Sequence, residues 1–283
     1  MNIPFIKMHG AGNDYIFVDC FENVVEQPEK LAVKISDRHF GVGSDGLVLI
    51  LPSKIADCKM RIFNSDGSEA KMCGNAIRCV GKYFFENITD KKNIIKIETL
   101  SGIKTLELFA NAKNNHIISE VKVDMGKADF TAKNIPMLCD TDTYINSPLK
   151  IDDEEYKITA VSIGNPHCVV FCENIDAIPL ETLGTKFEHH PIFPDRVNTE
   201  FVQIIDNQEI KMCVWECGSG ETMACGTGAC ASVAAAIKNN LLSFDTEICV
   251  KLKGGELNIT CRPDYQIFMC GNAVEICRGI FAG

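Results

Sequence analysis

The hydrophobic positions are grouped in short runs that predict many strands and few helices. Apolar, β-prone stretches bounded by Gly, Asn and Pro recur along the whole chain. We expect two strands within 3–19, and others at 47–51, 94–98, 104–109, 117–123, 156–163, 168–171, 200–205, 210–215, 247–252, 256–262, 265–269 and 273–278. Residues 124–150 contain Pro136 and Pro148 and are predicted to be irregular.

Helical signals occur in four places. Pro28 favours the start of a short helix over 27–36, and a second short helix is expected over 178–186. The two other helices are predicted over 75–87 and 227–238. Their residues leave little polar surface, which predicts a helix buried at the centre of each domain.

One stretch is present twice and precedes both central helices. Residues 64–75 and 216–227 each contain a Gly-rich turn, a Glu four residues before a Cys, and then Cys-Gly. Cys73 and Cys225 are 152 residues apart, and the same offset relates 12–18 to 164–170 and 61–63 to 213–215. This repeat predicts two similar domains related by a pseudo-twofold axis, with both cysteines at one cleft.

The domain boundary is expected in the irregular segment, giving domains 1–125 and 126–283. In an alternative arrangement, the last strand returns to the N-terminal domain. A chain of 283 residues with 46% hydrophobic residues can fill two cores.

Charge and hydropathy limit the partners. The net charge of −10 argues against nucleic acid and anionic membranes, and no apolar run has the length of a membrane span. The N-terminus lacks the layout of a signal peptide, so we expect a cytoplasmic protein. The expected partner is a small molecule, and a homodimer is left open.

The chain has fifteen cysteines and no Cys-x-x-Cys. An odd count in a chain of this size disfavours a disulfide framework, and the spacing disfavours a zinc ribbon or a thioredoxin-like motif. Most of these thiols are expected to be buried as small hydrophobic groups.

Two cysteines at two helix starts indicate a particular chemistry. A helix N-terminus lowers the pKa of a thiol and binds carboxylates. Cys73 and Cys225 at one cleft would supply a base and an acid on opposite faces of one carbon, as inversion of an amino acid at Cα requires. His167 and Glu216 are the candidates to relay protons to these thiols. The scheme needs no cofactor, and we find no motif for pyridoxal phosphate.

The chain resembles the diaminopimelate epimerase family in seven motifs. Members of this family are cofactor-independent two-cysteine epimerases. The motifs follow the family's order over nearly the whole chain and comprise residues 8–14, 37–43, 63–69, 72–75, 164–168, 197–201 and 224–230. The resemblance implies an α/β (α+β) fold of two domains, each a mostly antiparallel sheet wrapped around a central helix. It also implies that Cys73 and Cys225 are the acid–base pair, assisted by His167 and Glu216.

The resemblance further implies a substrate pocket rich in amides. The residues that would line it are Asn13, Asn64, Asn165 and Asn198. The residues that would hold the reacting α-carboxylate are Gly74, Asn75, Gly226 and Thr227.

Cys217 departs from the family pattern, which has an Arg here to grip the far carboxylate of diaminopimelate. A thiol cannot replace a guanidinium in that contact. The departure favours another free amino acid as substrate, with histidine the first candidate. Diaminopimelate is the alternative, and it would require another cation, such as Arg196 or Lys71. A smaller departure is Asn272, where the family usually has Pro.

Three other functions compete with this interpretation. A thiol redox protein could also place Cys at a helix start, although oxidation of the two thiols is more plausible as an inactivation route. The i, i+4 cysteine pairs at 168/172 and 213/217 are spread too far along strand-like segments to share one metal ion. A proline racemase is a third option, which activity on proline would identify.

Overall fold

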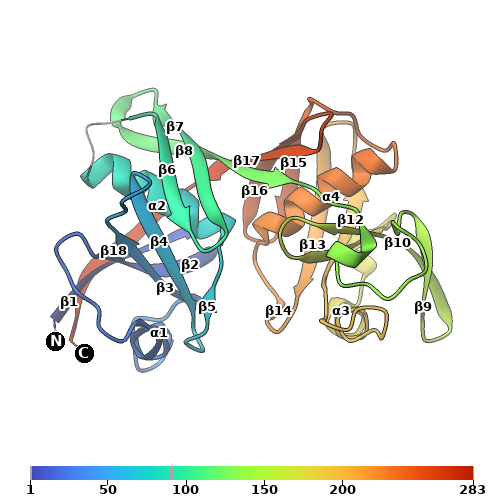
Figure 1. The fold of residues 1–283 in the computed structure, drawn as a ribbon, viewed down its shortest axis with the longest axis horizontal. Helices are drawn as coiled ribbons and strands as arrows, with labels where there is room; N and C mark the ends of the chain where they lie inside the picture. Colours follow the sequence, from blue (N-terminus) through green and yellow to red (C-terminus); the bar gives the residue numbers. More distant parts are fainter. Residues whose placement is uncertain (1, 89–91, 283) are drawn as a thin grey trace. The chain divides into compact units, whose positions relative to one another are not determined.

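The computed structural model describes residues 2–88 and 92–282, which form two compact units. Unit 1 takes the residues up to Asp124 and those from Cys270 onward, and unit 2 is Met125–Met269. The chain crosses between the units within β8 (Asn114–Lys127) and within β17 (Gln266–Asn272) (Figure 1). The C-terminal segment lies in unit 1, as in the alternative arrangement in which the last strand returns to the N-terminal domain, and not as in a simple division into 1–125 and 126–283.

Unit 1 is a mixed sheet with two helices. Its other strands are β1 (Asn2–Gly10), β2 (Asn13–Asp19), β3 (Gly46–Leu51), β4 (Cys58–Asn64), β5 (Glu69–Ala70), β6 (Ile94–Thr99), β7 (Gly102–Asn111) and β18 (Val274–Ala282). Its helices are α1 (Pro28–Ser36) and α2 (Gly74–Asn87). Most neighbouring strands are antiparallel, whereas β2–β3 and β4–β6 are parallel.

Unit 2 repeats this plan. Its other strands are β9 (Ser147–Ile151), β10 (Glu154–Ser162), β11 (Pro166–Phe171), β12 (Asn198–Ile204), β13 (Glu209–Glu216), β14 (Gly220–Glu221), β15 (Glu247–Leu252) and β16 (Gly255–Cys261). Its α-helices are α3 (Leu180–Glu188) and α4 (Gly226–Lys238), and the 3₁₀ turns are η1 (Ala132–Asn134) and η2 (Ile175–Ala177). Here β11–β12 and β13–β15 are the parallel pairs. The 152-residue repeat in the sequence therefore corresponds to a repeat of topology.

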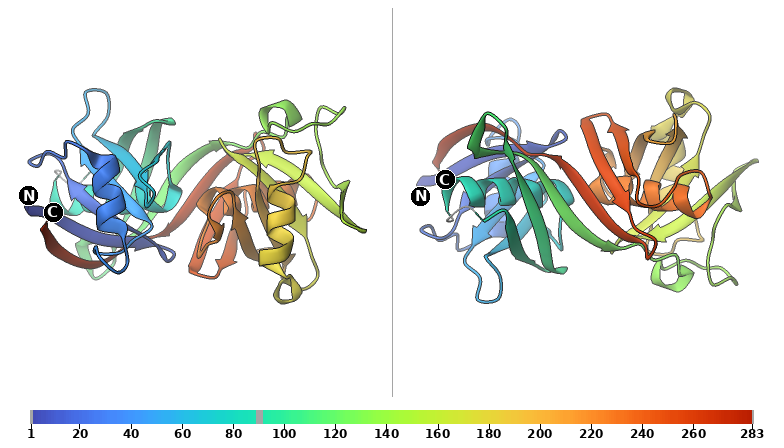
Figure 2. Two further views of the ribbon diagram at one scale, coloured as in Figure 1. Left: turned by 90° about the horizontal axis from the view of Figure 1, so that it is seen from below. Right: turned by 90° about the horizontal axis from the view of Figure 1, so that it is seen from above.

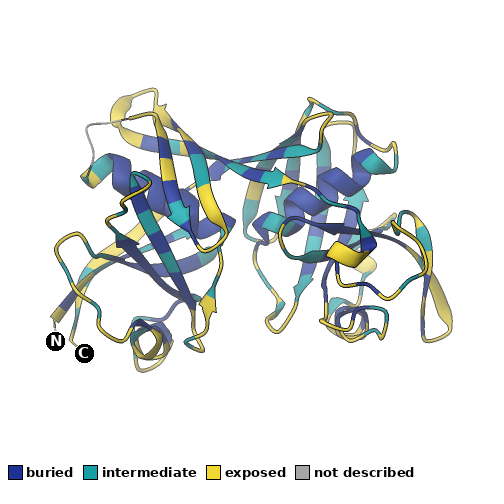
Figure 3. Ribbon diagram, in the orientation of Figure 1, coloured by how far each residue is buried: buried dark blue, intermediate teal, exposed yellow. Residues whose placement is uncertain are grey.

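The central helices are buried as their sequences predict. Figure 2 shows the strands of each unit arranged around α2 or α4, and Figure 3 shows both helices buried over most of their length. In α2 every residue from Gly74 to Phe85 is buried, including the fully buried Arg78. Among the described residues, none of the helices has the length and apolar character needed to cross a bilayer.

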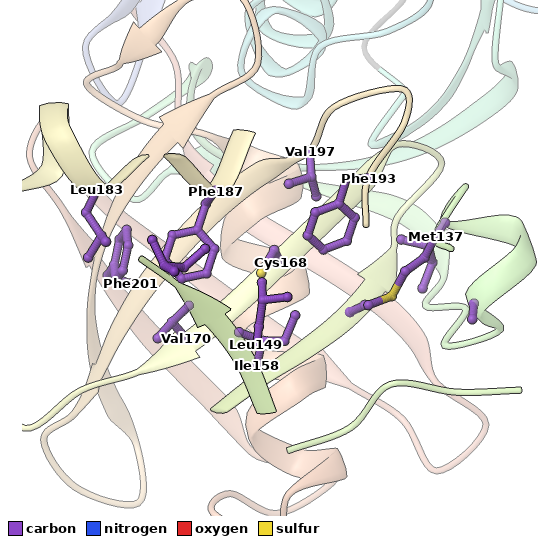
Figure 4. Close-up of a cluster of buried hydrophobic side chains, with 14 residues drawn as sticks. Met137, Leu149, Ile158, Cys168, Val170, Leu183, Phe187, Phe193, Val197 and Phe201 are labelled. Atoms are coloured by element: carbon purple, nitrogen blue, oxygen red, sulfur yellow. The ribbon is translucent and has the colours of Figure 1, made fainter. Parts of the chain in front are cut away.

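A second hydrophobic layer of unit 2 fixes α3 against the sheet (Figure 4). Phe187 of α3 packs edge-on against Phe201 of β12, with ring centroids 5.7 Å apart. It makes a similar contact with Tyr156 of β10 at 5.4 Å. This packing determines where the last residue of α3, Glu188, lies relative to β13.

The prediction of an irregular segment over 124–150 is partly wrong. Strand β8 continues to Lys127, and β9 forms over Ser147–Ile151. Pro148 suggested a break, but β9 pairs with β10 through residues 147–151, and a proline is tolerated in such a strand where its missing N–H is not required by a neighbour.

Candidate functional site

Cys225 is the N-cap residue of α4. Its backbone is extended, with φ −112° and ψ 109°, and its Sγ accepts a hydrogen bond from the Gly228 N–H at 3.3 Å. The Thr227 hydroxyl lies 3.4 Å from the same sulfur. The thiol is 5% exposed, so it meets the first turn of the helix in a nearly dry environment.

A chain of hydrogen bonds extends from this thiol into the sheet. The Asn165 amide donates to Thr227 Oγ1 at 3.3 Å, and Asn165 Oδ1 lies 3.1 Å from His167 Nε2. On the other side of the ring, His167 Nδ1 lies 2.7 Å from Glu200 Oε1. His167 therefore faces Asn165 and Glu200, and its link to Cys225 passes through Asn165 and Thr227.

Glu216, at the end of β13, is partly buried and accepts a short hydrogen bond from the Thr222 hydroxyl. Burial raises the pKa of the Glu216 carboxyl, although hydrogen bonds to Thr222 and Cys225 oppose that shift. Glu216 thus lies within hydrogen-bond reach of Cys225.

The expectation that a helix N-terminus lowers the thiol pKa is wrong for Cys225. Burial raises the pKa of this thiol well above its ordinary value, and the charges of Glu216 and Glu200 raise it further. The hydrogen bonds from Thr227 and Gly228 act in the opposite direction but are outweighed.

Cys73 occupies the matching place in unit 1, as the N-cap of α2. Its thiol lies 3.5 Å from Asn13 Oδ1, which also accepts from the Asn75 amide at 3.3 Å. The Asn13 amide donates to Asp45 at 2.7 Å. Unit 1 therefore holds Asn13, Cys73 and Asn75 together, as unit 2 holds Asn165, Cys225 and Thr227.

Three residues near the two thiols are absent from the sequence-based candidates. Tyr15 is buried beside Cys73, and burial followed by the Cys73 charge raises the pKa of its phenol well above the ordinary value. Arg78 donates to Gly74 O and to Asn75 Oδ1, both at 3.1 Å, so it fixes the first turn of α2. The third residue is Glu200. Tyr15 could have been identified from the 152-residue offset, because that offset relates it to His167.

The remaining predicted residues lie in two different settings. Asn64 is exposed at the end of β4, where its amide donates to Ser68 Oγ at 3.0 Å. Asn198 is buried, and its amide donates to Pro166 O at 2.9 Å while its Oδ1 accepts from the Cys217 N–H at 3.0 Å. Asn198 therefore positions the backbone at Cys217. Gly74 and Gly226 are the first residues of α2 and α4.

Cys217 is exposed and lies beside Arg196, which belongs to the loop between α3 and β12. Burial and the Glu188 charge raise the pKa of the Cys217 thiol, while the Arg196 charge opposes them. Arg196 contacts Glu188 at 3.3 Å, and its side chain is 51% exposed. Glu188 also accepts from the Trp215 indole at 2.7 Å and from the Gly218 N–H at 3.0 Å. A guanidinium therefore lies next to the position from which the expected Arg is missing.

Most of the cysteines are buried or half-buried, and Cys217 and Cys277 are exposed. Within the residues that the structure describes, no group of three or more His, Cys, Asp and Glu side chains is placed to hold a metal ion.

Comparison with known proteins identifies the family. The family model described as diaminopimelate epimerase matches residues 5–131 and 159–276. The chain belongs to the diaminopimelate epimerase family. Two curated relatives, both named diaminopimelate epimerase, are similar to this chain over nearly its full length. The protein from Acetivibrio thermocellus is 53% identical over 97% of both chains, and that from Methanococcus maripaludis is 49% identical over 98% of this chain and 99% of its own.

A solved structure of low sequence identity has the same fold. A probable proline racemase from Agrobacterium radiobacter K84 matches with a TM-score of 0.73 at 15% identity, covering 98% of this chain and 92% of its own. Membership of the diaminopimelate epimerase family makes the chain an isomerase of the racemase and epimerase class. The names of the relatives give no support to histidine as the substrate.

Proposed function

We propose that the protein is a diaminopimelate epimerase that interconverts the LL and meso forms of diaminopimelate. The observation that carries this proposal is the identity of 53% and 49% to curated diaminopimelate epimerases over nearly their full lengths. The same identity favours diaminopimelate over histidine, although Cys217 departs from the family pattern.

The proposed reaction uses two thiols and no cofactor. One of Cys73 and Cys225 removes the Cα proton as a thiolate, and the other, as a thiol, delivers a proton to the opposite face. The mechanism requires both sulfurs to reach one substrate carbon, and the two roles exchange in the reverse reaction. The raised pKa of Cys225 favours the protonated form that one member of the pair must have.

Helix N-termini supply the electrostatic part of the proposed catalysis. A Cα–H next to a carboxylate is only weakly acidic, so the negative charge that develops there must be stabilised. The first turns of α2 and α4 begin directly after the two cysteines and present backbone N–H groups and a partial positive charge. Glu216, within reach of Cys225, is the proposed proton relay for that thiol.

Arg196 is the proposed contact for the far carboxylate of the substrate. It lies beside Cys217, and about half of its side chain is exposed. Its contact with Glu188 fixes the guanidinium, and the exposed part remains able to donate to a carboxylate. Lys71, the other cation considered, is exposed in unit 1.

Proton NMR in deuterated water tests the proposed substrate. The reduced enzyme is incubated with diaminopimelate, histidine, proline and other single amino acids, and loss of each Cα–H signal is followed. We expect exchange of diaminopimelate alone. Exchange of histidine or another monocarboxylate, without diaminopimelate, would refute the proposal. As controls, the variants Cys73→Ala and Cys225→Ala should each abolish epimerisation.

A further inference from the structure

Unit 2 contains an ion pair with no exposure to solvent. His167 on β11 and Glu200 on β12 are both 0% exposed, and Nδ1 and Oε1 are 2.7 Å apart. Within the part of the chain that the structure describes, the second oxygen, Glu200 Oε2, has no hydrogen-bond partner. Replacing a buried ion pair by apolar residues of similar volume is often neutral or stabilising. Stability alone is therefore a weak reason for this pair.

The internal repeat allows His167 and Glu200 to be compared with the equivalent residues of unit 1. At the 152-residue offset, Tyr15 corresponds to His167 and Val48 corresponds to Glu200. The strand register agrees, because Phe17 is paired with Val48 as Val169 is paired with Glu200. Val48 is fully buried and apolar, so this sheet does not need a carboxylate there.

The carboxylate also lies against the start of α4. A Cβ at Gly228 would come within 2.7 Å of Glu200 Oε1 and 3.3 Å of Cys225 Cβ. The absence of a side chain at Gly228 thus lets Glu200 approach the helix turn that carries the thiol.

The orientation of His167 follows from its two neighbours. A carboxylate oxygen accepts hydrogen bonds, so in this pair Nδ1 is the donor and Glu200 Oε1 the acceptor, at 2.7 Å. Asn165 Oδ1 is an acceptor, so Nε2 donates to it at 3.1 Å, and both ring nitrogens act as donors in this arrangement. The Asn165 amide donates in turn to Thr227 beside the Cys225 sulfur. Rotation of the imidazole would break this connection at both ends.

We propose that Glu200 is a positioning residue for the reaction at Cys225. Its buried carboxylate holds the His167 ring in one orientation, and the ring in turn holds the Asn165 amide and the Thr227 hydroxyl against the thiol. The proposal rests on the proposed function, because it assigns Cys225 a role in proton transfer at the substrate.

The variant Glu200→Gln tests the proposal with little change of shape. We expect kcat for the amino acid that exchanges in the deuterium assay to fall about 100-fold, with KM changed less than about threefold. Glu200→Asp retains the charge but shortens the side chain, and should give a smaller loss. An unchanged kcat for Glu200→Gln would overturn the proposal.

Thr199→Val is the matched control on the same strand. Thr199 is also fully buried, and its hydroxyl is without a partner among the described residues. This variant should retain kcat within about twofold, since valine has nearly the same shape. A loss like that of Glu200→Gln would assign the effect to general disturbance of β12 and would count against the proposal.

A double-mutant cycle distinguishes positioning from a separate structural role. If Glu200 acts through His167, the variant with both Glu200→Gln and His167→Gln should be no slower than His167→Gln alone. If the fall in kcat of the double variant equals the product of the falls in the two single variants, the proposal is contradicted.

Nitrogen-15 NMR of labelled histidine rings tests the geometry without reference to the substrate. In the wild-type protein the His167 signal, assigned by its loss in His167→Gln, should show a proton on Nδ1. An unprotonated Nδ1 would overturn the proposal. If no amino acid exchanges in the deuterium assay, the proposed function fails, while this measurement still decides whether Glu200 orients the ring.

Discussion

The Cys225 thiol lies at a helix N-terminus, and yet its pKa is raised rather than lowered. Charge–dipole attraction from the helix start is of modest size and depends on the surrounding dielectric. Burial disfavours the thiolate more strongly, and Glu216 and Glu200 both lie close enough to add repulsion. The pKa of this thiol is therefore determined more by the groups packed around it than by its position at a helix N-terminus.

At the same scale, Arg196 is expected to determine recognition of the far carboxylate. Replacing Arg196 by Gln removes a charge-assisted contact, which is worth about 2–3 kcal/mol, so KM for diaminopimelate should rise about 100-fold. Arg196→Lys should show a smaller effect, because a lysine retains the charge but not the planar fork. Steady-state kinetics with diaminopimelate measures both.

Lys71→Gln is the comparison for this prediction. Lys71 is the alternative cation for the far carboxylate. The substitution Lys71→Gln should leave KM for diaminopimelate nearly unchanged. A large rise in KM for Lys71→Gln with none for Arg196→Gln would transfer the role to Lys71.

At the scale of elements, α3 approaches its sheet closely at a glycine. A Cβ at Gly184 would lie 2.5 Å from Cγ and 2.6 Å from Cβ of Trp215, so only glycine allows this helix to pack on β13. The same helix ends at Glu188, which accepts from the Trp215 indole and contacts Arg196. The packing of α3 thus determines the position of the cation beside Cys217.

Gly184→Ala should therefore destabilise the protein. Alanine favours a helix over glycine by about 1 kcal/mol, but overpacking against a rigid indole costs about 1–3 kcal/mol. We expect a net loss in the free energy of unfolding of up to about 2 kcal/mol, in urea titrations followed by the fluorescence of the single tryptophan. Thr182→Ala, at an exposed position of α3, should show no loss. Equal or greater stability of Gly184→Ala would contradict the close packing.

At the scale of the molecule, burial raises the pKa of several thiols in both units. Burial raises the pKa of Cys58, Cys79 and Cys261 to about 12 in each case. The folded protein holds these protons at pH values where the unfolded chain releases them. Their contribution to stability is complete below about pH 8.5 and is lost as the pH rises towards 12.

The free energy of unfolding should consequently fall above about pH 9, by about 1.4 kcal/mol per pH unit for each such thiol. Denaturant titrations with a reductant at several pH values measure the slope. Cys79→Ala removes one fully buried thiol and should reduce the slope. A stability that rises between pH 9 and 10.5 would contradict the sign of the effect.

The local pattern was enough to predict most of the fold. Pro28 begins α1, and Cys73 and Cys225 immediately precede the two central helices. These features depend on neighbours in the chain, namely turn residues, capping positions and apolar periodicity. Strand β9 was missed because its pairing with β10 compensates for Pro148, and pairing is not visible in a local pattern.

The candidate site was predictable where the repeat places related residues at helix starts. Sequence reasoning missed Glu200 because, in an alternating strand, it resembles a surface charge. Only the parallel pairing of β11 with β12 brings it to His167. Arg78 was missed for a similar reason, since its carbonyl partners include Asn272, which is 194 residues away in the chain.

The order of elements, the two cysteines and the repeat follow from the chain alone, because propensity, capping and periodicity act over a few residues. The protonation of Cys225, the orientation of His167 and the position of Arg196 beside Cys217 follow from the folded structure. Each depends on burial and on charges contributed by strands and loops distant in sequence, and electrostatic energies are set by distance in space and by exclusion of water.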